Sequence, residues 1–287
     1  MLEARDFAAT LGLEAKETYT LYAEVGRDTL LLVLTASGAD CICPVTWKYP
    51  IAGRVPYKGF FDPEEGRRAA AELEERGYDV NLRPSAAFST LGWFNDPLLS
   101  TALERDSVEL VALVIHEIAH NTLWVKGNVA FNESYAQYVG YRGAEAFFLA
   151  RNDTLSARRA ADRWHDEKVL GDFYGRLVAR AESLYGTKPD SATLRAGKIA
   201  LAEWARGEFE EPVGAILRTV RVTPSTIAAS RPINNARLVG ITIYRTNLPK
   251  FDAWHARYDG DLVRAVAGLD SAMVGVTGDT AWTRLSP

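Results

Sequence analysis

Two histidines and a glutamate lie close together in the stretch VIHEIAHNTLWVKGNVAFNES, residues 114–134. On a helix, His116 and His120 lie one turn apart on the same face, where both imidazoles can bind one metal ion. Glu117 projects beside that ion. Its carboxylate can take a proton from a zinc-bound water, whose pKa the ion lowers to about 7. The spacing therefore predicts a zinc site that carries the general base of a hydrolase.

A catalytic zinc site has three protein ligands and one open position. We predict Glu133 as the third ligand, because residues 126–128 can reverse the chain and Asn132 can cap a second helix that presents Glu133 to the first. A third histidine six residues after His120 would make a different site, but that position is Lys126. The alternative is an amphipathic helix that carries two histidines and no ion.

The surrounding sequence predicts the elements that position this motif. Asp106 or Ser107 can cap a helix that runs to about residue 125 and carries a stripe of apolar residues. Upstream, the patterns predict helices at residues 3–12 and 62–76, extended structure at 18–35, strands at 41–47 and 78–82, and a loop at 49–61. Downstream, they predict helices at residues 132–184, with breaks near 140 and 152–153, and at 190–210 and 260–269, with a short apolar segment at 238–244.

These elements place the chain in the α+β class, with a mixed sheet in the N-terminal part and a largely helical C-terminal part. We expect a single domain over residues 1–287 with two lobes. The strand-rich lobe covers about residues 1–150 and carries the zinc site. The helical lobe covers about residues 151–287.

Composition excludes several classes of function. The net charge is -4, and no Lys/Arg-rich run is interleaved with aromatic residues, which argues against nucleic acid as a partner. The longest apolar run, residues 30–34, is far shorter than the roughly 18 to 20 residues of a membrane span. Residues 1–7 carry acidic side chains and no apolar core of a secretory signal.

The two cysteines, Cys41 and Cys43, are separated by one residue in a predicted strand. We expect this strand to point the two side chains to opposite faces. We expect no disulfide between them and treat both as structural residues, because two thiols do not complete a zinc tetrahedron.

Several longer motifs resemble those of the bacterial family of predicted aminopeptidases. They are PYKGFF at residues 56–61, FSTLGWF at 88–94 with Asp96 and Pro97, HEIAH at 116–120, FNES at 131–134, and NNA at 234–236 with Tyr244. The resemblance implies a zincin-like fold with a gluzincin-like site. It implies one Zn²⁺ held by His116, His120 and Glu133, with Glu117 as catalytic base and a peptide or protein as substrate.

The resemblance leaves some roles open. Removal of N-terminal residues requires an acidic group for the substrate ammonium, for which Asp96 is a candidate. Thermolysin-like gluzincins carry an acidic residue four positions after the glutamate ligand, but that position is Gln137 here, so another group must orient the histidines. Family members often carry a lipoprotein-type leader, which is not present in this sequence and would imply a location in the cell envelope.

Other residues have candidate roles beside a packing role. Tyr244 or Asn235 could donate a hydrogen bond to the oxyanion, although Tyr244 also ends an apolar run and could be a packing residue. Residues 89–94 could form an edge strand that pairs with a peptide, or a turn packed by aromatic side chains. We expect His165 and His255 to be structural. A rival hypothesis is a non-catalytic zinc-containing binding or scaffold protein, against which the presence of Glu117 argues.

Overall fold

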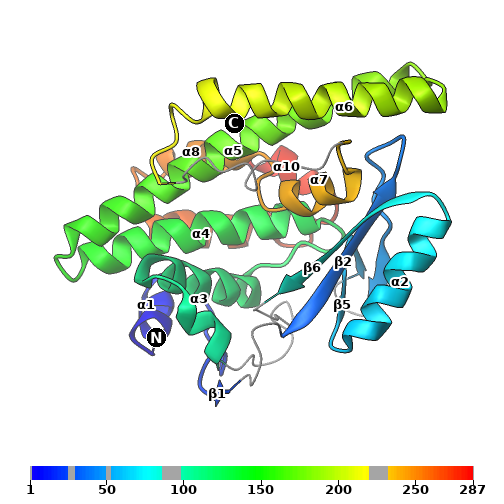
Figure 1. Ribbon diagram of the computed structural model, residues 1–287. Coiled ribbons are helices and arrows are strands. Elements are labelled where there is room, and N and C mark those ends of the chain that lie inside the picture. The colour runs from blue at the N-terminus through cyan, green and yellow to red at the C-terminus, as the bar shows by residue number, and fades with distance from the viewer. Residues whose placement is uncertain (1, 25–29, 50–52, 86–97, 220–231, 287) are drawn as a thin grey trace.

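The computed structural model describes residues 2–24, 30–49, 53–85, 98–219 and 232–286. Its strands lie in the N-terminal part of the chain and most of its helices follow them (Figure 1). The first elements are α1 (Leu2–Thr10), β1 (Tyr22–Ala23), β2 (Leu31–Gly38), β3 (Trp47–Tyr49), β4 (Gly53–Val55), β5 (Lys58–Phe60), α2 (Pro63–Glu75), β6 (Tyr78–Ser85), β7 (Leu98–Leu99) and the 3₁₀ helix η1 (Ser100–Glu104).

Long helices then dominate the chain, which confirms the predicted mixture of a small sheet with a largely helical remainder. They are α3 (Ser107–Thr122), α4 (Val129–Leu149), α5 (Thr154–Gly186), α6 (Ser191–Glu208), the π-helical η2 (Phe209–Val213), α7 (Asn235–Thr242), α8 (Leu248–Ala256), α9 (Leu262–Met273) and α10 (Thr280–Arg284). Among the described residues, no helix is both long enough and apolar enough to cross a membrane.

Strand β2 is the centre of a three-stranded antiparallel sheet in the order β5-β2-β6. Alternate side chains of a strand point to opposite faces, and both faces of β2 are covered. Leu34 and Ala36 pack in one apolar cluster with Leu73 of α2. On the other face, the hydroxyl of Thr35 donates to the carbonyl of Ala236 in α7 at 3.1 Å. The sheet is therefore held between α2 and α7 (Figure 1).

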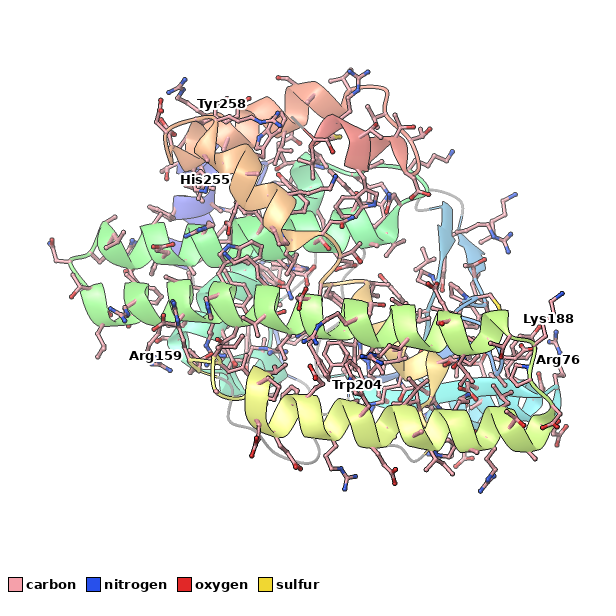
Figure 2. All side chains as sticks on the ribbon, turned by 90° about the horizontal axis from the view of Figure 1, so that it is seen from above. Arg76, Arg159, Lys188, Trp204, His255 and Tyr258 are labelled. Atoms are coloured by element: carbon pink, nitrogen blue, oxygen red, sulfur yellow. A yellow bond between two sulfur atoms is a disulfide. The ribbon has the colours of Figure 1, made fainter. Side chains whose placement is uncertain are left out.

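Helices α3, α4, α5 and α6 are stacked one beside the next (Figure 1). Viewed from above, α5 and α6 run side by side, and Trp204 of α6 stacks on Phe173 of α5 (Figure 2). Helix α4 is buried over most of its length. The core around α3 and α4 also includes residues of α1, α8, α9 and α10, so both ends of the chain contribute to it. The boundary between two lobes near residue 150 stays a prediction.

The predicted starts of two helices are confirmed. Asp62 caps α2 by accepting from the backbone N–H of Glu64, and Pro63 occupies the first helical position. Asp106 caps α3 by accepting from the N–H groups of Val108 and Glu109, both at 3.0 Å. Helix α3 ends at Thr122, three residues earlier than expected, and the chain then turns toward α4.

The prediction of a loop over residues 49–61 is wrong in part, because β3, β4 and β5 include residues of this segment. Strands β3 and β4 pair antiparallel, with Tyr49 opposite Gly53, and β5 joins the sheet against β2. Each of these strands has only three residues. The pairing of β5 depends on the distant strand β2, which the glycines and prolines of the local sequence do not reveal.

The prediction about the cysteines is also wrong, because Cys41 and Cys43 form a disulfide. Their Cα atoms are 5.3 Å apart, whereas two residues of an extended strand advance by about 6.6 Å. Residues 39–41 form a turn and bend instead of the expected strand. Side chains two residues apart already share a face of an extended chain, and the bend brings the two residues closer together. Asn235 holds the bend by donating to the carbonyl of Cys41 at 3.2 Å.

The predicted break near residue 140 is wrong, because α4 continues through Gly140 to Leu149. A Cβ on Gly140 would lie 2.8 Å from the carbonyl oxygen of Ala112 and 3.2 Å from the Cβ of His116. Glycine is required here because the backbone of α3 passes against α4. The break at residues 152–153 is confirmed between α4 and α5.

We expect Gly140→Ala to destabilise the protein, since the new methyl group must push α3 away from α4. Overpacking of this kind costs about 1 to 3 kcal/mol, against a gain of about 1 kcal/mol from helix propensity. The matched control is Gly175→Ala in α5, where a Cβ meets no atom within 4 Å and only the gain remains. Urea unfolding should show that the first variant is less stable than the second, and equal stabilities would contradict the close approach.

Candidate metal centre

Three ligand atoms converge between α3 and α4. The Nε2 atoms of His116 and His120 lie 3.4 Å and 3.6 Å from Oε2 of Glu133. One donor atom from each residue lies within 4.8 Å of the other two, so the group could hold a metal ion. The exposed fractions are 8% for His116, 4% for His120 and 2% for Glu133. The three predicted ligands are therefore brought together in a buried position.

The two histidines occupy one face of α3, as their spacing predicts. Their rings meet edge to face, with centroids 4.9 Å apart. His120 also contacts the ring of Trp124 at 5.6 Å. Gly140 of α4 lies against the backbone of His116, so the absence of a side chain at this position lets the two helices meet at the site.

Glu133 reaches the histidines through the tight turn between α3 and α4. Gly127 has a φ of 82°, which an L residue rarely adopts. The helix cap is Asn128, whose side chain accepts from the N–H of Phe131 at 2.9 Å. The predicted cap, Asn132, lies instead within the first turn of α4, so the helix begins earlier than expected. Glu133 consequently projects from a formed helical turn.

Asn132 has another role, because its buried side chain bonds to both polar groups of the Val125 backbone. Its Oδ1 accepts from the N–H of Val125 at 2.8 Å, and its Nδ2 donates to the carbonyl of Val125 at 2.9 Å. This pair of hydrogen bonds connects the segment just after α3 directly to the residue before Glu133. The two bonds thereby help to set how far Glu133 lies from the face of α3 that carries the histidines.

Residues 277 and 278, near the C-terminus, bond to the same turn. The N–H of Gly278 donates to the carbonyl of Lys126 at 2.9 Å, and Asn128 donates to the carbonyl of Gly278 at 3.2 Å. A bridge also pairs Lys126 with Thr277. Residues separated by about 150 positions in the sequence therefore stabilise the turn that presents Glu133.

Glu133 is ionised, as a metal ligand must be. Burial alone would raise the pKa of its carboxyl group, but the hydrogen bonds with His116 and His120 outweigh burial and lower it to about 2. The same contact raises the pKa of His120 against the opposing effect of its burial. This mutual stabilisation holds a negative charge at the point where the ligand atoms converge.

Glu117 extends from α3 beside His116, and its side chain is half-buried. Among the described residues its Oε2 is buried without a hydrogen-bond partner. A carboxylate oxygen that is desolvated and unpaired is costly, so such atoms in a folded protein call for an explanation. The charge of Glu117 acts on His120, so it lies near the converging atoms, and its role as a base stays a prediction.

Two tyrosines lie near the glutamates. The hydroxyl of Tyr57 donates to Oε1 of Glu133 at 3.4 Å, and the Tyr244 ring lies 6.5 Å from the His116 ring. Burial, followed by the charge of Glu133, raises the pKa of Tyr57 well above its ordinary value. The charge of Glu133, followed by burial, raises the pKa of Tyr244. Both phenols are therefore protonated hydrogen-bond donors.

Tyr244 is held near the site by α4 itself. Ser134, the residue after Glu133, is fully buried and accepts from the N–H of Thr246 at 3.1 Å. This bond ties the segment after α7 to the helix that carries the third ligand. The sequence analysis gave Tyr57 no role of its own, although Tyr57 lies in the PYKGFF motif, because its segment resembled a loop and no local pattern relates it to the two histidines.

The other residues singled out in the sequence analysis either make structural contacts or lie outside the described part of the chain. The Asn235 amide is occupied by backbone carbonyls and by the hydroxyl of Tyr185, which makes it a structural residue. His165 pairs with Asp166 at 3.2 Å, and His255 contacts the ring of Tyr138, as their predicted structural roles require. No described residue bonds to the buried Nδ1 of His120. Asp96 and residues 89–94 lie outside the described part of the chain.

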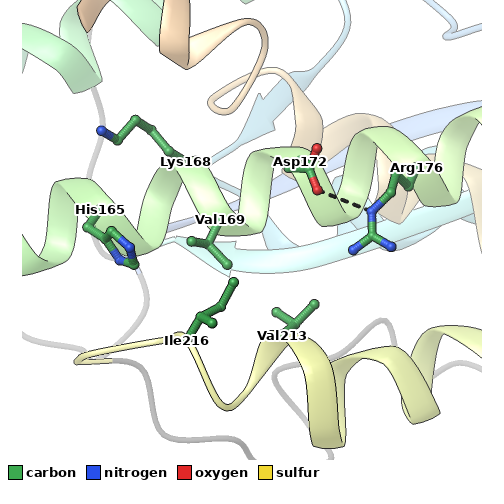
Figure 3. Close-up of a pocket in the computed structure, with 7 residues that line it drawn as sticks. All are labelled: His165, Lys168, Val169, Asp172, Arg176, Val213 and Ile216. Atoms are coloured by element: carbon green, nitrogen blue, oxygen red, sulfur yellow. Dashed lines mark hydrogen bonds and ion pairs between the residues drawn. The ribbon is translucent and has the colours of Figure 1, made fainter.

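A separate hollow of about 350 Å³ lies between α5 and the segment that contains η2 (Figure 3). Its apolar wall is formed by Val169, Val213 and Ile216. Asp172 and Arg176 on its rim form an ion pair at 3.1 Å. The other polar rim groups are also paired: His165 with Asp166 and Lys168 with Asp252. Among the described residues that line this hollow, every charged side chain is therefore paired.

We expect Asn132→Ala to lower the free energy of unfolding by about 2 kcal/mol, because two buried backbone groups lose their partners at about 1 kcal/mol each or more. It should also weaken metal binding by loosening the turn. The control is Asn121→Ala, which removes one buried hydrogen bond, to Thr18, from the same helix as the histidines. Denaturant unfolding and metal titration of both variants test this. Equal metal affinities in the two variants would contradict the role of Asn132.

Comparison with known proteins gives one match. The family described as "Putative aminopeptidase" matches residues 1–273. No curated protein and no solved structure matches the chain. The match includes helices α3 and α4, which carry the three candidate ligands, and ends before residues 277 and 278, which contact the turn between these helices. Because the match covers most of its length, the chain belongs to the family of putative aminopeptidases.

Proposed function

We propose that the protein is a zinc-dependent peptidase with a zincin-like site, in which His116, His120 and Glu133 hold the ion and Glu117 is the general base. One observation carries the proposal. Three buried ligand atoms converge within 4.8 Å of one another, next to a glutamate whose buried oxygen has no partner among the described residues. A site used only for structure has no need of such a base.

The donor set fits zinc. Two imidazole nitrogens and one carboxylate oxygen are ligands that zinc accepts, and three protein ligands leave a position open. The low pKa of Glu133 supplies the negative charge that a divalent cation requires. When bound, the ion would polarise the substrate carbonyl and make a water molecule more acidic.

The protein's own residues perform the proton transfers in this proposal. Glu117 accepts a proton from the attacking water and later delivers it to the leaving amine. The hydroxyl of Tyr244 donates to the oxyanion that forms on the substrate carbonyl. Membership of the family supports a peptide as the substrate. Removal of single N-terminal residues would further require an acidic group for the substrate ammonium.

We expect Glu117→Gln to bind zinc as the wild type does but to hydrolyse peptides about 10² to 10⁴ times more slowly, since an amide cannot accept the proton. Hydrolysis of a peptide library, followed by mass spectrometry with and without a chelator, measures the rate and separates exopeptidase from endopeptidase products. The control is Glu109→Gln on the first turn of the same helix, which should stay active. Full activity of Glu117→Gln would refute the mechanism. Inactivity of the zinc-loaded wild type would favour a non-catalytic role.

We expect Glu133→Gln to reduce zinc affinity at least 100-fold, because even residues that only support a ligand contribute about 10- to 100-fold. The substitution keeps the volume of the side chain and removes its charge. Glu145→Gln, near the other end of α4, is the matched control and should bind zinc normally. Competition with a chromophoric chelator gives the affinities. Undiminished binding by Glu133→Gln would remove this residue from the site.

A further inference from the structure

The two oxygens of the Glu133 carboxylate have different surroundings. Oε2 faces both histidines, at 3.4 Å from Nε2 of His116 and 3.6 Å from Nε2 of His120. Oε1 points to the other side and accepts the hydrogen bond from the hydroxyl of Tyr57. One oxygen is thus free to bind an ion together with the histidines, and the other is held by a phenol.

Tyr57 is placed by the sheet and not by the helices that carry the three ligands. It lies in the short connection between β4 and β5, and β5 is paired with the central strand β2. Its ring packs in an apolar cluster with Val55, Trp124 and Val129. Val129 is the first residue of α4, so this cluster fixes Tyr57 relative to the helix turn from which Glu133 projects.

The connection is also close to the turn between α3 and α4. A Cβ on Gly53 would lie 3.9 Å from Cγ of Lys126 and 4.0 Å from the backbone nitrogen of Gly127. The strand segment, the turn and the start of α4 therefore pack as one unit. Tyr57 cannot move away from Glu133 without disturbing this unit.

We propose that Tyr57 is a positioning residue, which orients the Glu133 carboxylate so that Oε2 alone is presented to the metal. The inference rests on the proposed function only in requiring that the site bind an ion. A carboxylate that rotates freely loses conformational freedom when it binds, whereas one held by a hydrogen bond is already oriented. Groups that hold metal ligands in this way contribute about 10- to 100-fold in affinity.

Tyr244 provides the comparison within the same site. It is also a phenol close to Glu133, and the charge of Glu133 acts on both tyrosines. Among the described residues, however, its hydroxyl has no hydrogen-bond partner, whereas that of Tyr57 donates to Glu133. Removing either hydroxyl deletes the same chemical group, but only the removal from Tyr57 frees the carboxylate.

The test is zinc affinity, measured by chelator competition for the wild type, Tyr57→Phe and Tyr244→Phe. We expect about 10- to 100-fold weaker binding for Tyr57→Phe and a change of less than about threefold for Tyr244→Phe. Both substitutions keep the aromatic ring, so the apo proteins should unfold at similar temperatures. At saturating zinc, Tyr57→Phe should recover most of its kcat, since its role is to hold the ligand.

A double variant separates the hydrogen bond from general packing. In a Glu133→Gln background, Tyr57→Phe should weaken zinc binding no further, because the carboxylate that Tyr57 orients is gone. Equal zinc affinity of the wild type and Tyr57→Phe would overturn the inference, as would an equal loss in Tyr244→Phe. A wild type that binds no zinc would instead refute the proposed function, so the two failures are distinguishable.

Discussion

The arrangement of the centre depends on one buried charge, the carboxylate of Glu133. An ionised carboxylate that is almost completely removed from water is costly unless other groups compensate for it. Here two histidines contact one of its oxygens and a tyrosine hydroxyl the other. The contacts with the two histidines lower the pKa of the carboxyl group to about 2, against the effect of burial. The elements near the site supply or position the groups that stabilise this charge.

Three parts of the fold meet at that point. Helix α3 provides the histidines, and Gly140 lets α4 lie directly against it. Asn132 joins the segment after α3 to the start of α4 by two buried hydrogen bonds. The sheet contributes Tyr57, and the segment after α7 contributes Tyr244 through a bond to Ser134. The sheet lies beside the ends of α3 and α4 in Figure 1 and therefore takes part in the candidate metal centre.

The errors in the sequence-based predictions share a physical cause. Strand β5 is stabilised by the distant strand β2, and the bend that joins Cys41 to Cys43 by the distant residue Asn235. Their local sequences contain the glycines, prolines and polar residues that are typical of loops. Gly140 was interpreted as a break for the same reason, since only the neighbouring helix shows why a glycine is needed there. Local propensity is a weak guide wherever tertiary contacts decide.

The sequence by itself determined the chemistry of α3. Residues four apart on a helix share a face by geometry, so the positions of His116, His120 and Glu117 followed from their spacing alone. It also indicated Glu133, because the turn between the helices is short. Only the tertiary structure decided that Asn128 and not Asn132 caps α4, that Tyr57 holds the carboxylate, and that Tyr244 lies beside His116. Those contacts join segments far apart in the chain, and their distances are set by the packing of whole elements, which no local pattern encodes.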